Sequence, residues 1–156
     1  MKLSPKKLFQ LFATAEVLTW ALLLAGLAIR ATVGIAPEVI FAVGAAHGFV
    51  FLGYGVTAAL AGVNQRWKLG RVLLGIALAI VPFATLPFDK SLSKKGLLEG
   101  NWRTTKSDHP SDNSWFDALF RWFIARPLVL VAVLLIGVIA MFSFLLFIGP
   151  PDQWGR

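Results

Sequence analysis

The chain contains no cysteine and only two histidines, His47 and His109. Without cysteine it forms no disulfides, thiolate metal sites, iron–sulfur clusters or covalent haem c linkage. Only His47 lies in an apolar segment, so one chain does not offer two axial histidines to a haem in the membrane. The sequence also shows no phosphate loop and no nucleophile–histidine spacing. We therefore predict no enzyme activity, no catalytic or metal-binding residues, and no cofactor bound by this chain alone.

Charged residues are scarce as well. They make up 15% of the 156 residues, whereas hydrophobic residues make up 57%, and the mean hydropathy is +0.72. Soluble domains carry roughly 25% charged residues. These values indicate an integral membrane protein that forms one small bundle. The net charge of +7 does not indicate nucleic-acid binding, because the lysines and arginines lie at helix ends and in loops, beside lipid head groups.

Four apolar runs predict an all-α fold, a membrane bundle of four transmembrane helices plus one interfacial amphipathic helix. A helix that crosses the hydrocarbon core needs about 20 apolar residues. Pro82 falls inside the third run, where it should kink the helix or end it. The four runs cover residues 8–29, 40–63, 69–88 and 128–148.

The same pattern divides the chain into four parts. Residues 1–90 are predicted to form a three-helix membrane domain. Residues 91–113 are rich in charge, Ser, Gly and Asn, so they should form an extramembranous loop that is mobile on its own. Residues 114–126 are predicted as the interfacial helix, and residues 127–156 as the fourth spanning helix with a short tail.

Basic residues predict the orientation in a bacterial cell membrane. Around the first three predicted helices, basic residues gather before the first helix and between the second and the third. Only Arg30 lies between the first helix and the second. Because cytoplasmic loops carry the excess of Lys and Arg, the N-terminus should be cytoplasmic. Four spans then place the C-terminus in the cytoplasm and the loop 89–126 outside. That loop carries seven basic residues, which conflicts with the rule, so the first helices are given the greater weight.

Glu16 is the one carboxylate inside a hydrophobic run. A charge near the bilayer centre costs about 3 kcal/mol on insertion scales, so this side chain should face protein. One interpretation is a carboxyl group that is hydrogen-bonded to a neighbouring helix. A second is a proton or cation relay, and a third is exposure to a wet cavity without function.

The short link over residues 31–39 makes the first two helices antiparallel neighbours, which sets the depths of their polar residues. Glu16 and Tyr54 should lie at similar depth, so a hydrogen bond between them is favoured. His47 should lie about 10 Å away, nearer to Trp20 and Leu24, at ~1.5 Å of rise per residue. A Glu16–His47 pair stays open as an alternative. The predicted intramembrane polar cluster is therefore Glu16, Trp20, His47 and Tyr54.

The second helix should be the hub of the bundle because one of its faces is small and polar. Gly44, Gly48 and Gly55 share this face with His47 and Tyr54 at helical spacing. Helices in lipid associate through small residues that allow close approach and through polar groups. We therefore predict helix packing at Gly44, Gly48 and Gly55.

An amphipathic helix is predicted over residues 114–126, with Ser114 and Asp117 as a capping pair. Its aromatic stripe should either lie at the head-group boundary or dock on another membrane protein. A lipid-handling role would rest on this stripe alone. The predicted contact residues are Trp115, Phe116, Leu119, Phe120, Trp122 and Phe123.

Three stretches together resemble a bacterial family of small integral membrane proteins with a domain of unassigned function, frequent in actinobacteria. They are residues 15–20 (AEVLTW), 47–54 (HGFVFLGY) and 81–85 (VPFAT), and the resemblance covers roughly residues 6–90. It supplies no activity. It implies that the polar or kinked family-type positions are Glu16, Trp20, His47, Tyr54 and Pro82.

The length and the extra helix are also similar to small accessory subunits of the actinobacterial respiratory supercomplex of cytochrome bc complex and cytochrome oxidase. This resemblance implies a non-catalytic role in assembly or stability, with haem and copper only in the partner subunits. The expected partners are those membrane subunits and lipids, and not nucleic acid. The alternative function is a small oligomeric transporter or channel that uses Glu16 and His47 as a proton-coupled path.

Overall fold

The computed structural model describes residues 3–148 and divides after Trp102 into two compact units, an N-terminal unit and a C-terminal unit. Every regular element in the described residues is a helix, and none of these residues forms a strand, so the predicted all-α class is confirmed.

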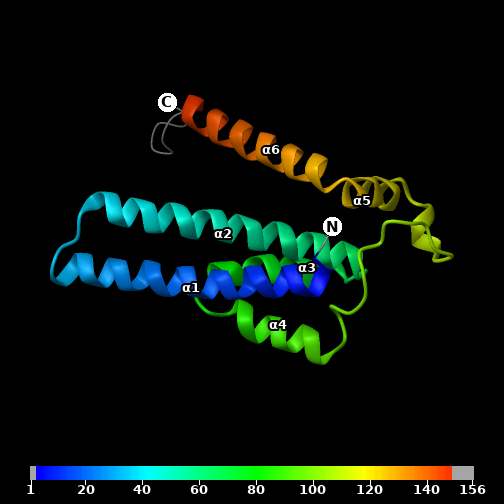
Figure 1. Cartoon of the computed structure of the whole chain (residues 1–156), viewed down its shortest axis with the longest axis horizontal. Coiled ribbons are helices and arrows are strands. Elements are labelled where there is room, and N and C mark those ends of the chain that lie inside the picture. Colours follow the sequence, from blue (N-terminus) through cyan, green and yellow to red (C-terminus); the bar gives the residue numbers. More distant parts are fainter. Residues whose placement is uncertain (1–2, 149–156) are drawn as a thin grey trace. The chain divides into compact units, whose positions relative to one another are not determined.

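Two long antiparallel helices form the frame of the N-terminal unit (Figure 1). They are α1 (Pro5–Thr32) and α2 (Pro37–Asn64), each of 28 residues. Each begins with proline, whose fixed φ suits the first helical position, and the Ser4 side chain caps α1 by accepting from the Lys7 backbone N–H. Both helices are long and apolar enough to cross a membrane. The first two predicted spans and their short link are confirmed.

The third apolar run does not form one spanning helix. It forms α3 (Leu69–Ala77) and a 3-10 turn, η1 (Leu78–Ile80), and then breaks before α4 (Thr85–Lys94). The break contains Pro82, as predicted, and Phe83 in the left-handed region at φ 65°. Together α3 and η1 rise about 20 Å, short of the ~30 Å hydrocarbon core. Four spans are therefore not confirmed: the described residues contain two spanning helices, or three if a bent pair is counted.

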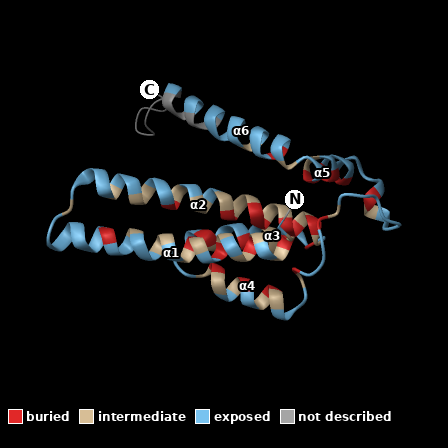
Figure 2. Cartoon of the chain, in the orientation of Figure 1, coloured by how far each residue is buried: buried red, intermediate tan, exposed pale blue. Residues whose placement is uncertain are grey.

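The core of the N-terminal unit gathers toward one end of the α1–α2 hairpin (Figure 2). Phe9, Tyr54, Leu92 and Leu98 are fully or almost fully buried there, whereas the hairpin near its link is mostly exposed. Glycine permits two of these contacts. A Cβ on Gly75 would lie 2.9 Å from the Phe88 ring. A Cβ on Gly62 would lie 2.6 Å from Val72 Cγ2.

The glycines predicted to pack the second helix have no such contact. A Cβ on Gly44, Gly48 or Gly55 would meet nothing within 4 Å outside its own helix. Close approach occurs instead at Gly53 against Phe12, on a different side of α2. The packing role of Gly44, Gly48 and Gly55 is therefore not confirmed within this chain, because α3 meets α2 nearer its C-terminal end, at Gly62.

The segment after α4 is fastened to the end of α2 by three side chains. Trp67 Nε1 donates to the Leu97 carbonyl at 2.9 Å. Gln65 Nε2 donates to the Glu99 carbonyl at 2.8 Å, and Asn64 Nδ2 to the Asn101 carbonyl at 3.1 Å. Residues 97–101 thus belong to the packed unit and do not form a separate loop.

The start of α1 holds the same segment. Lys6 Nζ lies 2.7 Å from Glu99 Oε1, and Trp102 Nε1 donates to the Leu3 carbonyl at 2.7 Å. This differs from the predicted arrangement, in which a third spanning helix separates the segment from the N-terminus. The chain turns back at Pro82, so residues 97–102 lie at the end of the unit where α1 begins.

The C-terminal unit contains η2 (Pro110–Asn113), α5 (Trp115–Ala125) and α6 (Pro127–Ile148). The Ser114 hydroxyl accepts from the Asp117 N–H at 3.1 Å, which confirms the predicted cap, and α6 begins at Pro127. The axis bends by 105° between α5 and the part of α6 up to Ala140. Residues 149–156, where the predicted cytoplasmic C-terminus falls, lie outside the described residues.

A buried ion-pair network around Asp112 organises residues 103–121. Arg103 Nη1 lies 2.7 Å from Asp112 Oδ1 and 2.8 Å from Asp117 Oδ1. Ser107 donates to Asp112 Oδ2 through its N–H and its hydroxyl, and Arg121 Nη2 donates to the Asp112 carbonyl. The network gives a defined conformation to a stretch whose composition predicted a mobile loop.

Asp112→Asn should destabilise the C-terminal unit by about 3 kcal/mol, because the buried Arg121 and the half-buried Arg103 lose their shared carboxylate and, in the described residues, only Arg103 keeps another, that of Asp117. The Ser107 amide donates a hydrogen bond to Asp112 Oδ2, so its hydrogen exchange should become much faster in the variant. Asp108→Asn, at an exposed aspartate next to Ser107, is the matched control. Equal exchange in the two variants would contradict this account of the network.

Candidate functional site

Glu16 is completely buried on the face of α1 that receives α4. The Thr85 hydroxyl lies 3.3 Å from Glu16 Oε2 and 3.1 Å from the Ala13 carbonyl. A hydroxyl has one hydrogen to donate, so these two acceptors share it. Glu16 Oε1 has no hydrogen-bond partner among the described residues. The carboxyl group is therefore bonded to a neighbouring helix through one oxygen, and its other oxygen is buried without a hydrogen-bond partner in the described residues.

Tyr54 on α2 is also completely buried, with its ring 5.5 Å from that of Phe9. Its hydroxyl has no hydrogen-bond partner among the described residues, so the predicted Glu16–Tyr54 hydrogen bond is wrong. The reason is that α4 inserts Thr85 beside Glu16. Tyr54 nevertheless lies close enough to Glu16 and Asp89 to belong to the same polar group.

Asp89 is the site residue that the sequence analysis missed. It lies one turn after Thr85 on α4, is 7% exposed, and its Oδ1 has no hydrogen-bond partner in the described part of the chain. Burial raises the pKa of Asp89, and this effect is opposed by a hydrogen bond from Gln10 and by the charges of Lys6 and Lys90. The signal that could have found it is the i, i+4 spacing of Thr85 and Asp89 after the Pro82 break.

His47 belongs to a second polar group, nearer the middle of α1. Its Nδ1 lies 3.1 Å from the Thr19 hydroxyl, and its ring centroid lies 4.5 Å from that of Trp20. Trp20 Nε1 donates to the Ala79 carbonyl in η1 at 3.1 Å. The predicted closeness of His47 to Trp20 is confirmed, and Thr19, which also bonds the Glu16 carbonyl, stands between His47 and Glu16.

The four predicted polar residues thus do not form one cluster. Glu16 and Tyr54 join Thr85 and Asp89 in what we call the carboxylate group. His47 and Trp20 join Thr19 in a separate histidine group. Both groups line the interior of the N-terminal unit, with the carboxylate group on the side of the N-terminus. Among residues 3–148, no three His, Asp or Glu side chains come together to hold a metal ion.

A shallow apolar groove opens between α1 and α2 beside the histidine group. Its volume is about 220 Å³. Its wall includes Thr19, whose hydroxyl contacts His47, and Ala46, which precedes His47 in α2. The other lining residues are Leu22, Ala42 and Val43. The groove therefore lies on the same half of α2 as the uncovered Gly44 and Gly48.

The aromatic stripe of α5 is largely exposed, although not all of it is available. Trp115 is 77% exposed, and Phe116, Leu119 and Trp122 are exposed as well. Phe120 is buried beneath Arg103, whose guanidinium lies 5.5 Å from its ring centroid. Phe123 is half-buried, with its ring 5.1 Å from that of Trp122. The contact surface that α5 offers is therefore narrower than predicted.

Comparison with known proteins places this arrangement in a family. The family described as Domain of unknown function (DUF3817) matches residues 6–94. The chain belongs to this family. Its matched region ends at the last residue of α4, so it contains the returning helix with Thr85 and Asp89 as well as Glu16, His47 and Tyr54. No curated protein and no solved structure matches the chain.

Thr85→Val should destabilise the N-terminal unit by about 1–2 kcal/mol, because it removes the hydroxyl shared by Glu16 and Ala13 and leaves a buried carboxyl without that donor. Thr85→Ser keeps the hydroxyl and is the matched control. Thermal unfolding of the purified chain in mild detergent measures the difference. A Val variant as stable as the Ser variant would show that the hydroxyl does not hold α4 to α1.

Asp89→Asn should flatten the dependence of stability on pH. Because burial raises the pKa of Asp89 above its usual 3.8, the folded state holds this proton more tightly than the unfolded state. The contribution of Asp89 to stability is then fully present below 3.8 and is lost as the pH rises through the raised pKa. Above pH 3.8, the melting temperature of the wild type should fall more steeply with rising pH than that of Asp89→Asn. Parallel curves would contradict the assignment, and Asp108→Asn serves as control.

Proposed function

We propose that the protein is a non-catalytic accessory subunit of a larger membrane complex. The observation that carries this proposal is the uncovered face of α2, where a Cβ on Gly44 or Gly48 would meet nothing within 4 Å. In lipid, such small residues let a second helix approach closely, which is how membrane helices associate without a hydrophobic driving force. The occupant we propose is a transmembrane helix of another subunit.

The groove beside this face supports the same occupant. It has an apolar lining and lies between two spanning helices, so apolar side chains of a neighbouring helix would fill it. The exposed aromatic side chains of α5, led by Trp115 and Trp122, provide a second surface for partner subunits or for lipid head groups.

The complex we propose is the respiratory supercomplex of cytochrome bc complex and cytochrome oxidase in a bacterial cell membrane. The support is the resemblance in size and in the extra helix after the family domain. With no cysteine and one histidine in its spanning helices, the chain would leave haem and copper to its partners. Its role there would be assembly or stability of the complex.

The test is affinity purification of the tagged chain in mild detergent, with a visible absorption spectrum and mass spectrometry. Wild type should bring down haem-containing subunits in near-stoichiometric amounts, and the double variant Gly44→Leu/Gly48→Leu should lose them. The single variant Gly70→Leu is the matched control, because a Cβ there also meets nothing within 4 Å. A clean homo-oligomer without haem would contradict the respiratory assignment.

The double variant also tests the competing occupant, which is α6 of the same chain. Because nothing within residues 3–102 fills the face, leucine at Gly44 and Gly48 should leave the melting temperature unchanged. A large drop, with partners retained, would show that the chain covers its own face and would overturn the proposed docking.

A second candidate function is a proton-coupled path through the N-terminal unit. The observation in its favour is the set of buried oxygens without hydrogen-bond partners in the described residues, on Glu16, Tyr54 and Asp89. They lie on α1, α2 and α4, and α1 packs against both of the other helices. His47, the other member of the path, contacts the Thr19 hydroxyl, which bonds the backbone carbonyl of Glu16 and not its carboxyl group.

Flux measured in liposomes separates the two functions. A proton path predicts pH-driven flux by the purified chain that falls at least tenfold in Glu16→Gln. Asp89→Asn should reduce it as well. The accessory role predicts no flux above that of empty liposomes for any of these proteins, whereas assembly with partners is retained.

A further inference from the structure

The polar contacts of the broken third run follow α1 backwards toward its start. The first contact, from η1, is near the middle of α1. Residues that come later in the chain contact residues progressively nearer the start of α1. The contacts are Ala79 with Trp20, Thr85 with Glu16 and Ala13, Glu99 with Lys6, and Trp102 with Leu3. The chain therefore enters beside α1, turns at Pro82 and retraces its path.

Neither arm of this hairpin is long enough to cross a bilayer. The arm formed by α3 and η1 rises about 20 Å and α4 about 15 Å, against ~30 Å of hydrocarbon. The arms begin and end together, since Trp67, just before α3, bonds the carbonyl of Leu97, just after α4. The turn at Val81–Ala84 lies farthest from both ends of the hairpin. The Val81 N–H donates to the Leu78 carbonyl and the Ala84 N–H to the Val81 carbonyl, while Trp20 bonds Ala79 just before the turn.

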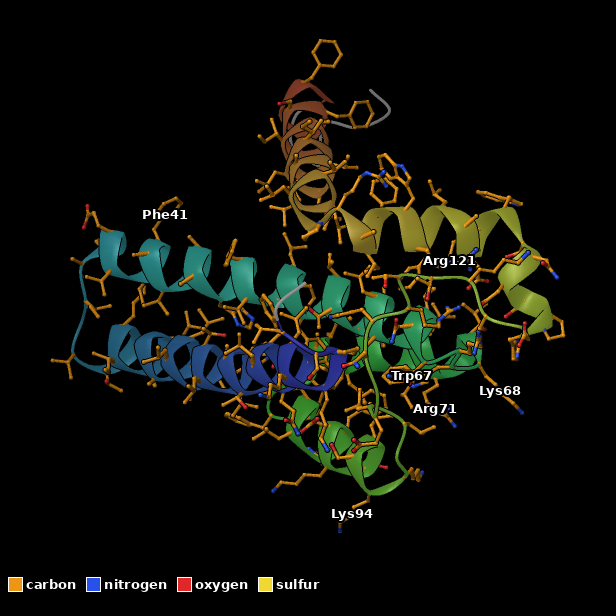
Figure 3. The ribbon with its side chains drawn as sticks, turned by 45° about the vertical axis from the view of Figure 1, so that its right-hand side comes forward. Phe41, Trp67, Lys68, Arg71, Lys94 and Arg121 are labelled. Carbon is orange, nitrogen blue, oxygen red and sulfur yellow. The ribbon has the colours of Figure 1, made fainter. Side chains whose placement is uncertain are left out.

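Charge is divided unequally between the two ends of the N-terminal unit. The end of the unit that carries the α1–α2 link has Arg30 in the last turn of α1 and Glu38 in the first turn of α2, and their charges balance each other. Figure 3 shows Lys68, Arg71 and Lys94 toward the other end, away from Phe41. The one exposed acidic side chain there is Glu99, which is paired with Lys6. We define the basic end as Lys6, Lys7, Arg66, Lys68, Arg71, Lys90, Lys94 and Lys95.

We propose that residues 69–94 form a re-entrant hairpin and that the basic end, on the cytoplasmic side, binds the anionic head groups of the inner leaflet. Both segments that flank the hairpin then lie on the side of the N-terminus. The basic residues after α4 no longer conflict with the excess of Lys and Arg in cytoplasmic loops. A cluster of lysines and arginines next to spanning helices attracts anionic lipid within about one Debye length of the surface.

The natural absence of cysteine makes the topology directly testable with single cysteines in the full chain. Lys68→Cys and Asn101→Cys flank the hairpin, and Val33→Cys reports the opposite end; all three positions are exposed. A membrane-impermeant maleimide should label Val33→Cys in intact spheroplasts. It should label Lys68→Cys and Asn101→Cys only in inside-out vesicles. Labelling of Lys68→Cys and Asn101→Cys from opposite sides would overturn the re-entrant hairpin.

Lipid binding is tested by the melting temperature of the purified full chain. Phosphatidylglycerol should raise it more than phosphatidylcholine does, and added salt should reduce the difference. The triple variant Lys90→Gln/Lys94→Gln/Lys95→Gln should lose at least half of this lipid-specific shift. Arg30→Gln, at the opposite end, should keep it. Equal shifts with both lipids, or an equal loss in Arg30→Gln, would overturn the assignment of the basic end.

Discussion

The return of the chain at Pro82 is the constraint on which the rest of the N-terminal unit depends. Pro82 cannot continue the helical hydrogen-bond ladder, and Phe83 turns the backbone in the left-handed region. This brings α4 against α1, where Thr85 bonds Ala13 and Glu16. The same return brings Leu97 and Glu99 to the ends of α2 and α1. One break thus buries Glu16 beneath α4 and adds Lys90, Lys94 and Lys95 to the end of the unit that already carries Lys6 and Lys7.

The buried carboxyl groups are costly in this position, and the chain compensates for them only partly. Glu16 receives one donor, and Asp89 is flanked by Gln10 and the nearby Lys6 charge, yet each keeps an oxygen without a partner in the described residues. Replacement of such groups by apolar residues is often neutral or stabilising in proteins. A function of the bundle other than packing would therefore be found at these buried carboxyl groups. By contrast, the Lys6–Glu99 pair lies at the surface and contributes at most about 1 kcal/mol to the free energy of unfolding.

Much of this fold could be predicted from the sequence because hydropathy and helix signals are local. The places of α1 and α2, the start of α6 at Pro127, the Ser114 cap and the break at Pro82 all follow from short stretches, although α1 and α2 are each longer than the predicted runs. The proximity of His47 to Trp20 followed from depth along antiparallel helices. The return of α4 was not predictable, because the apolar run from Leu69 to Phe88 has the length of a span. Asp89 was missed for the same reason, and so was the role of Asp112, whose partners come together only in the folded unit.

The central claim is that the chain turns back, so the most direct test is a pair of distances in the lipid-embedded protein. Spin labels on Lys7→Cys and Lys95→Cys should lie close together, since Lys6 and Glu99 are in contact. Labels on Val33→Cys and Lys95→Cys should be separated by about 40 Å, the length of α1. Electron–electron double resonance should therefore give a shorter distance for the Lys7–Lys95 pair than for the Val33–Lys95 pair. A short distance from Val33 to Lys95, with a long one from Lys7, would mean that the third run crosses the membrane, and would contradict it.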